Sequence, residues 1–123
     1  MMPAPPQKKP VVLVVEDQAL VRCCVVDQLQ DAGFGVIEAA NAEQALRAFD
    51  EHAEVTTVFT DISMPGRFNG LSLARQVRAR RPGVQLIVTS GRSAPDKADM
   101  PAGARFLPKP YDCLALKAMI QVA

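Results

Sequence analysis

Short apolar runs alternate along the chain with longer stretches whose apolar residues recur at helical spacing. The runs are rich in Val, Ile, Leu and Phe, which is typical of strands that are buried on both faces. They predict strands at 11–15, 36–37, 55–60, 84–89 and 105–108. Strands that alternate with helices favour a parallel sheet covered on both faces, because each crossover returns right-handed. We therefore predict a doubly wound α/β fold with a five-stranded parallel sheet in the order 2-1-3-4-5.

The helical stretches carry their own start and stop signals. Asn41, with Gln44 three residues later, is typical of a helix N-cap with a capping box. Asp112 predicts the cap of the last helix, and Gly33 predicts the end of the first. The inner face of the first helix is expected from its apolar residues at helical spacing, Val21, Cys24, Val25, Leu29 and Ala32.

The connection at 91–104 breaks this regular alternation. Its sequence, GRSAPDKADMPAGA, holds two prolines and two glycines. Proline and glycine both disfavour helix interiors, so little more than one turn of helix fits there. We therefore predict that the fourth helix of the fold is short.

Composition limits the class of protein. A length of 123 residues fits one domain, and we expect a flexible Pro-rich arm at 1–9 followed by a single domain at 10–123. The 14 basic and 13 acidic residues leave a net charge of +1, which argues against direct nucleic-acid binding. No apolar run approaches the ~20 residues that span a bilayer, and we expect a cytoplasmic protein without a membrane segment. Cys23, Cys24 and Cys113 follow no disulfide or metal-binding spacing, so we expect reduced thiols, with the adjacent pair packed partly inward.

Polar residues interrupt the core pattern where four of the predicted strands end. They are Glu16-Asp17, Asp61, Thr89-Ser90 and Lys109. In open α/β sheets, ligands bind outside the carboxyl ends of the strands, at the point where the strand order reverses. The first and third strands are neighbours in the predicted order, so we expect Glu16, Asp17 and Asp61 to meet in one crevice.

Three carboxylates in one crevice need positive charge beside them. At ~5 Å and an effective dielectric constant near ~20, each pair costs roughly 3 kcal/mol. Lys109 supplies one positive charge, and its backbone is restricted by Pro108 and Pro110. Oxygen ligands that include one or two carboxylates suit Mg²⁺, so we expect Mg²⁺ as the cofactor.

A carboxylate is also a recognised nucleophile for phosphoryl groups, with which it forms an aspartyl phosphate. The transfer depends on in-line positioning and on cations that stabilise charge on the transferring oxygens. Lys109 and Mg²⁺ would do this, and a hydroxyl at Thr89 or Ser90 would hydrogen-bond a phosphoryl oxygen. The sequence therefore predicts phosphoryl chemistry at the strand ends.

With these residues in place, the chain resembles bacterial response-regulator receiver domains of the chemotaxis-regulator type, which have a flavodoxin-like fold. The resemblance covers residues 10–123 and rests on motifs that end predicted strands in the family's order. The motifs are Val15-Glu16-Asp17-Gln18, Asp61-Ile62-Ser63-Met64-Pro65, Thr89-Ser90-Gly91 and Phe106-Leu107-Pro108-Lys109-Pro110.

The resemblance implies a role for each matching residue. Asp61 is expected to be the phosphoacceptor, with Glu16 and Asp17 as metal ligands beside it. Ser63 is expected to offer its backbone carbonyl to Mg²⁺, which Asp61 also binds. Lys109 is expected to contact the phosphoryl group.

Two further positions are expected to change when the phosphoryl group arrives. The family's switch hydroxyl falls at Ser90, and Thr89 is the alternative. Phe106 matches the switch aromatic, although a plain core role fits the sequence equally well.

The implied function is that of a phosphoacceptor response regulator in a two-component or phosphorelay system. Asp61 is expected to take a phosphoryl group from a sensor histidine kinase or a histidine phosphotransfer protein, in an Mg²⁺-dependent reaction, and to switch partner binding. We expect no enzyme activity beyond self-phosphorylation and slow self-dephosphorylation. We expect no effector domain after the last helix, and we expect a monomer or weak homodimer that acts through an output protein that the sequence does not name. The short fourth helix departs from the family, in which that helix and the fifth strand form a main output surface.

Three other interpretations fit the sequence less well. A nucleotide or flavin module should have a Gly-rich phosphate loop after the first strand, where Glu16-Asp17-Gln18 stands. An aspartate-nucleophile hydrolase should have a second acidic residue at the position of Ser63. A degenerate receiver that works without phosphate need not keep the acceptor-site residues, all of which are present here.

Overall fold

The computed structural model describes residues 9–64, 69–92 and 94–120. The expected arm at 1–9 therefore lies outside the described residues except for Lys9, and so does Pro65 of the second motif. The elements in chain order are β1 (Val11–Val15), α1 (Ala19–Asp31), β2 (Gly35–Ala39), α2 (Ala42–Glu51), β3 (Thr57–Asp61), α3 (Gly70–Arg80), β4 (Gln85–Ser90), the 3₁₀ turn η1 (Lys97–Asp99), β5 (Arg105–Pro108) and α4 (Cys113–Met119).

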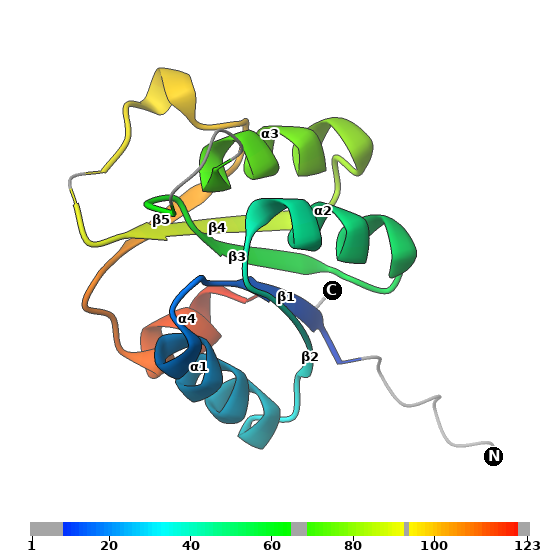
Figure 1. Cartoon of the computed structure of the whole chain (residues 1–123), viewed down its shortest axis with the longest axis vertical. Helices are drawn as coiled ribbons and strands as arrows, with labels where there is room; N and C mark the ends of the chain where they lie inside the picture. Colours follow the sequence, from blue (N-terminus) through cyan, green and yellow to red (C-terminus); the bar gives the residue numbers. More distant parts are fainter. Residues whose placement is uncertain (1–8, 65–68, 93, 121–123) are drawn as a thin grey trace, which may run out of the picture.

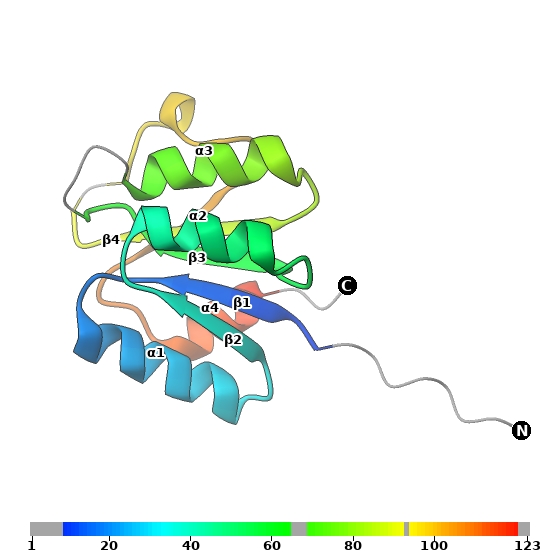
Figure 2. The same ribbon diagram turned by 45° about the vertical axis from the view of Figure 1, so that its right-hand side comes forward.

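The five strands form one parallel sheet in the order β2-β1-β3-β4-β5, as the sequence predicts (Figure 1). Helices α1 and α4 cover one face of the sheet, and α2 and α3 cover the other (Figure 2). Successive strand residues point to opposite faces, so β1 contributes to two cores. On the α1 and α4 side the core includes Val12, Val14, Val25, Leu29, Phe59, Ile87 and Leu116. On the α2 and α3 side it includes Leu13, Val15, Phe49, Val58, Leu73, Val77 and Val88.

Strand bounds differ from the sequence prediction in a direction that matters for the site. Strand β2 is longer than the expected 36–37, because it pairs with β1 from Val11 to Val15. Strands β3 and β4 begin and end later than expected, so that Asp61 and Ser90 are their last residues. Both side chains are thereby held by the sheet and not by a loop.

The predicted helix caps are confirmed. The Asn41 side chain accepts a hydrogen bond from the Gln44 backbone N–H at 2.8 Å, and the Asp112 side chain accepts one from Leu114 N–H at 2.8 Å. Gly33, just after α1, has φ +93°, a conformation that favours glycine and ends the helix.

The predicted inner face of α1 is partly wrong. The buried residues of the helix are Val25, Val26 and Leu29, whereas Cys23 and Cys24 are exposed. The helix is rotated so that Val26, not Cys24, packs on the sheet. The helix carries apolar residues on nearly all of its sides, so the sequence pattern alone does not determine which side faces the sheet.

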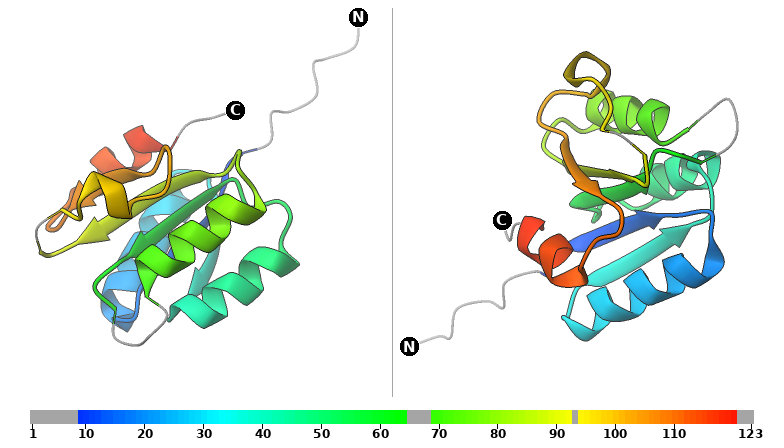
Figure 3. Two further views of the ribbon diagram at one scale, coloured as in Figure 1. Left: turned by 90° about the horizontal axis from the view of Figure 1, so that it is seen from above. Right: turned by 90° about the vertical axis from the view of Figure 1, so that its left-hand side faces the viewer.

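The connection between β4 and β5 contains the 3₁₀ turn η1 where the sequence predicts a short fourth helix (Figure 3). Helix α3 holds this segment through two arginines. Arg75 Nη2 donates to the Asp99 carbonyl at 2.9 Å, and Arg78 Nε donates to the Ala102 carbonyl at 2.8 Å. These hydrogen bonds to main-chain carbonyls anchor the segment, and Met100 and Ala104 pack against the core.

Candidate functional site: an acidic cluster with one lysine at the carboxyl ends of the strands

Asp61 ends β3 in the middle of the sheet and is 5% exposed. Its Oδ1 accepts a hydrogen bond from the Ser63 N–H at 2.7 Å, which fixes the orientation of the carboxylate. The start of α3 lies against the same turn. A Cβ on Gly70 would strike the Asp61 carbonyl oxygen and come within 2.7 Å of Ile62 Cα, so the close approach requires glycine here.

Lys109 bridges two of the carboxylates. Its Nζ donates to Asp61 Oδ2 at 2.7 Å and to Glu16 Oε1 at 2.9 Å. Burial lowers the pKa of this ammonium, but the hydrogen bonds to Asp61 and Glu16 outweigh burial and raise the pKa above its ordinary value. Lys109 is therefore a permanent cation at the site at physiological pH. The peptide bond between Lys109 and Pro110 is cis.

Glu16 and Asp17 follow β1 directly and differ in exposure. Glu16 is buried, and its Oε2 accepts from the Gln18 N–H at 3.1 Å. Asp17 is exposed. Burial raises the pKa of Glu16 above its ordinary value, although the hydrogen bond from Lys109 opposes the shift. Glu16 therefore pays a desolvation cost that additional positive charge nearby would reduce.

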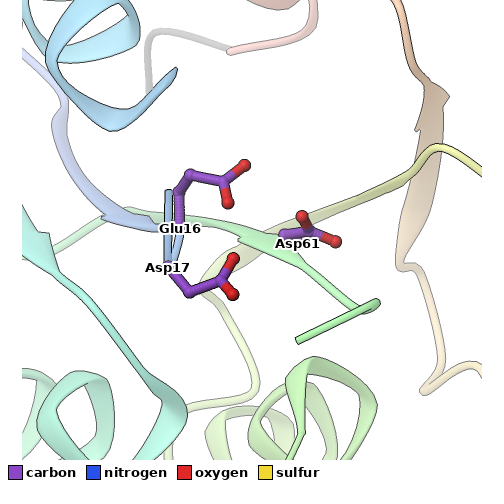
Figure 4. Close-up of side chains that lie close together, drawn as sticks. All are labelled: Glu16, Asp17 and Asp61. Atoms are coloured by element: carbon purple, nitrogen blue, oxygen red, sulfur yellow. The ribbon is translucent and has the colours of Figure 1, made fainter. Parts of the chain in front are cut away.

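The three carboxylates meet as the predicted strand order requires. Glu16, Asp17 and Asp61 each place one oxygen within 4.8 Å of the other two (Figure 4). Lys109 provides a single positive charge against three negative ones. An all-oxygen cluster with surplus negative charge, one member of which faces solvent, fits a hard divalent cation.

The two candidate hydroxyls on β4 have different surroundings. Ser90 Oγ lies 2.6 Å from Ser63 Oγ and also accepts from the Arg92 N–H at 3.0 Å. Thr89 Oγ1 is buried and has no hydrogen-bond partner among the described residues. The sheet register pairs Thr89 with Asp61.

Phe106 is half-buried on β5 and packs against the core on the α2 and α3 side. The sheet register pairs it with Val88, two residues before Ser90 on β4. Side chains two residues apart share a face of the sheet. Phe106 and Ser90 therefore lie on the same face.

An open groove of about 920 Å³ leads from the acidic cluster along α1. Its far wall is the segment that joins β5 to α4. Leu20 on α1 lines this groove and is 83% exposed, so an apolar side chain lies beside the acceptor on this side. The groove is lined by Asp17, Leu20, Val21, Cys24, Asp61, Arg92, Lys109, Tyr111 and Cys113, among others.

Several residues that shape the site did not stand out in the sequence. Arg22 donates to the Glu16 carbonyl at 2.7 Å and to Glu38 Oε1 at 3.1 Å, and thereby holds the end of β1. Tyr111 packs edge-on against Phe59 with ring centroids 5.4 Å apart, and burial raises its pKa to about 12. Asn69 caps α3, and a helix-start signal before Gly70 could have revealed it. The contacts of Arg22 and Tyr111 join distant segments and leave no local signal.

The fold and the acidic strand-end cluster define a doubly wound α/β protein of the signal-receiver class. The family model of the response regulator receiver domain matches residues 12–121, and the chain belongs to this family. It is a receiver domain of the type found in two-component response regulators. In the part of the chain that the structure describes, no helix is both long and apolar enough to span a membrane.

Bacterial relatives contain the domain within longer proteins. The sensor kinase CckA of Brucella abortus is 37% identical over 114 residues, which are 89% of this chain and 12% of that protein. The transcriptional regulatory protein PhoP of Escherichia coli is 34% identical over 113 residues, which are 89% of this chain and 50% of that protein. The chain thus spans half or less of these two curated relatives.

Solved structures agree with the fold along nearly the whole chain. A response regulator receiver protein from Sinorhizobium medicae has a TM-score of 0.84 at 25% identity, covering 91% of both chains. The chemotaxis protein CheY4 of Vibrio cholerae has a TM-score of 0.80 at 25% identity, covering 94% of this chain and 99% of that one.

Proposed function

We propose that Asp61 is the phosphoacceptor of this receiver, and that its charge state is used to switch the binding of an output protein. The observation that carries the proposal is the placement of the Asp61 carboxylate, which ends a buried strand with Lys109 Nζ at 2.7 Å and two further acids beside it. Such a carboxylate is oriented for attack, and the lysine can stabilise charge on the transferring oxygens.

The metal that we propose for this site is Mg²⁺. Glu16, Asp17 and Asp61 would hold it through carboxylate oxygens, and Ser63 through its backbone carbonyl. The tight oxygen cluster and its surplus of negative charge support this donor set. When bound, the ion would neutralise the charge that the acceptor and the phosphoryl group bring together.

The proposed donor is the phosphohistidine of a sensor histidine kinase or of a histidine phosphotransfer protein. An Asp61 carboxylate oxygen forms a bond to phosphorus while the P–N bond of the donor breaks. The electron pair of that bond stays with the imidazole, which takes up a proton. The groove beside α1, with exposed Leu20 at its edge, offers the donor an apolar approach to Asp61.

We assign the switch hydroxyl to Ser90 and the switch aromatic to Phe106. Two observations support Ser90 as the switch hydroxyl. Its hydrogen bond to the Ser63 hydroxyl could be exchanged for one to a phosphoryl oxygen, and Ser90 shares a face of the sheet with Phe106. Thr89 lies beside Asp61 in the register and remains the alternative for a contact with the phosphoryl group. Phosphorylation would draw the hydroxyl toward the new charge and open space for the aromatic ring.

Acetyl phosphate tests the acceptor assignment directly. With Mg²⁺ present, the wild-type protein should gain the mass of one phosphoryl group, whereas Asp61→Asn should gain none. Asp31→Asn, which alters an exposed aspartate at the end of α1, is the matched control and should behave as the wild type. A wild type that gains no mass, or an Asp61→Asn variant that still does, would contradict the proposal.

The same experiment extends to the remaining parts of the proposal. Removal of Mg²⁺ with a chelator should stop the mass gain, and the phosphorylated protein should slowly return to its original mass by self-hydrolysis. A transfer screen against purified histidine kinases would identify the donor. The cytoplasmic location, the domain limits at 10–123 and the monomer or weak homodimer remain predictions from the sequence.

A further inference from the structure

We propose that Ser63 is a positioning residue whose hydroxyl holds Ser90 in the resting state and thereby opposes phosphoryl binding. The inference rests on the proposed roles of Asp61 and Ser90. It adds a function for the Ser63 side chain, which the metal site does not use, because the ion would take the backbone carbonyl of that residue.

The direction of the Ser63–Ser90 hydrogen bond follows from burial. Ser90 is 2% exposed, and Ser63 Oγ, at 2.6 Å, is the one acceptor that the described residues offer to its hydroxyl hydrogen. Ser63 is exposed, so its own hydrogen can turn to water. If Ser63 donated instead, the Ser90 hydrogen would be buried without a partner, which costs free energy. Ser90 is therefore the donor and Ser63 the acceptor.

The oxygen of the Ser90 hydroxyl also accepts a hydrogen bond. The donor is the N–H of Arg92 at 3.0 Å, which fixes the hydroxyl from the other side. A hydroxyl has one hydrogen to donate. In the resting structure Ser90 donates that hydrogen to the Ser63 oxygen.

A phosphoryl oxygen can only accept hydrogen bonds, so Ser90 must donate its single hydrogen to bind one. The hydrogen bond from Ser90 to Ser63 must then break. The Ser63 hydroxyl and the phosphoryl group thus compete for the same hydrogen, and each exchange moves Ser90 between two partners. The strength of the Ser63–Ser90 hydrogen bond therefore contributes to the equilibrium between the resting conformation and the conformation that binds the phosphoryl group.

Beryllium fluoride, a non-hydrolysable phosphoryl analogue, tests the competition at equilibrium in saturating Mg²⁺. Ser63→Ala should bind the analogue about 3- to 10-fold more tightly than the wild type, as expected for the loss of one competing hydrogen bond. Ser63→Thr keeps the hydroxyl and should restore wild-type affinity. Ser72→Ala, a serine of α3, is the matched control and should leave the affinity unchanged.

A double-mutant cycle separates this competition from a general effect of the substitution. Ser90→Ala should weaken binding, and adding Ser63→Ala to it should change nothing further, because the hydrogen for which Ser63 competes is gone. An equal gain from Ser63→Ala in both backgrounds would overturn the inference. So would weaker binding by Ser63→Ala alone, which would mean that Ser63 assists the phosphoryl group.

The outcomes also distinguish this inference from the proposed function. A wild type that does not bind beryllium fluoride, or binding that survives Asp61→Asn, contradicts the acceptor assignment. If binding depends on Asp61 but is unchanged by Ser63→Ala, the proposed role of Ser63 is wrong and the acceptor assignment stands.

Discussion

The carboxyl ends of β1 and β3 and the connection from β4 to β5 are organised in opposite ways. At the strand ends, side chains contact side chains, and Lys109 joins Glu16 and Asp61 at hydrogen-bond distance. In the connection, arginines of α3 reach the main-chain carbonyls of Asp99 and Ala102. The first arrangement depends on charged side chains of both partners, whereas in the second the arginine side chains bond to the backbone. The second also depends on Met100, which packs on the core, and on Gly103, which has φ +75°.

This difference suggests where the domain is free to vary. The acceptor chemistry requires particular charged groups in fixed positions, so it constrains the strand ends. The connection keeps its carbonyls within reach of Arg75 and Arg78, and it also packs Met100 against the core. A surface that replaces the expected helix with a 3₁₀ turn offers a different shape to an output protein. The predictions below test whether the two regions are independent.

Lys109→Ala should have the largest effect on the chemistry. Removal of the ammonium leaves Glu16 and Asp61 without their shared partner and the phosphoryl oxygens without a donor. We expect phosphorylation by acetyl phosphate to slow by about 100-fold, measured as the rate of mass gain. Lys97→Ala, at an exposed position in η1, should match the wild type. A similar rate in both variants would mean that Lys109 does not act on the phosphoryl group.

Gly70→Ala should damage both the site and the fold, because the new methyl group meets the backbone of Asp61 and Ile62. We expect a loss of about 2–3 kcal/mol in the free energy of unfolding, measured with urea, together with weaker Mg²⁺ binding. Gly83→Ala is the matched control, since a Cβ there meets nothing within 4 Å. Equal stability of the two variants would show that α3 can move away from the acceptor turn without cost.

Arg78→Ala should weaken the connection and the turn between α3 and β4, and leave the acidic cluster unchanged. The side chain donates to the carbonyls of Ala102, Pro82 and Val84, at 2.8, 2.6 and 2.7 Å. We expect a loss of about 1–2 kcal/mol in the free energy of unfolding, with unchanged Mg²⁺ affinity. The exposed Arg47→Ala on α2 should change stability by less than about 0.5 kcal/mol. A marked drop in Mg²⁺ affinity in Arg78→Ala would show that the two regions are coupled.

Glu16→Gln should give the smallest effect, visible as a pH dependence. Burial raises the pKa of Glu16 in the folded protein, so the folded chain binds this proton more tightly than the unfolded chain does. The contribution of Glu16 to stability is thus fully present below its ordinary pKa and is lost as the pH rises through the folded pKa. In Mg²⁺-free buffer, the stability of Glu16→Gln relative to the wild type should therefore increase with pH. A difference that does not change with pH would contradict this origin of the shift.

The sequence by itself determined the strand order class, the alternation of strands and helices, and the position of each acid and lysine at a strand end. These features follow from short-range rules: β-branched runs favour strands, and Asn41 and Asp112 cap helices through hydrogen bonds within three residues. The weakness of the fourth helix was equally local, because Pro95 and Pro101 restrict their own backbone.

Only the tertiary structure decided the rotation of α1, the approach of Gly70 to Asp61 and the pairing of Ser63 with Ser90. Arg22 on α1 likewise meets Glu38 on β2. Such contacts depend on how rigid elements pack against each other to within an ångström or so. Local propensities do not carry that information, since it arises from the shape of the whole core.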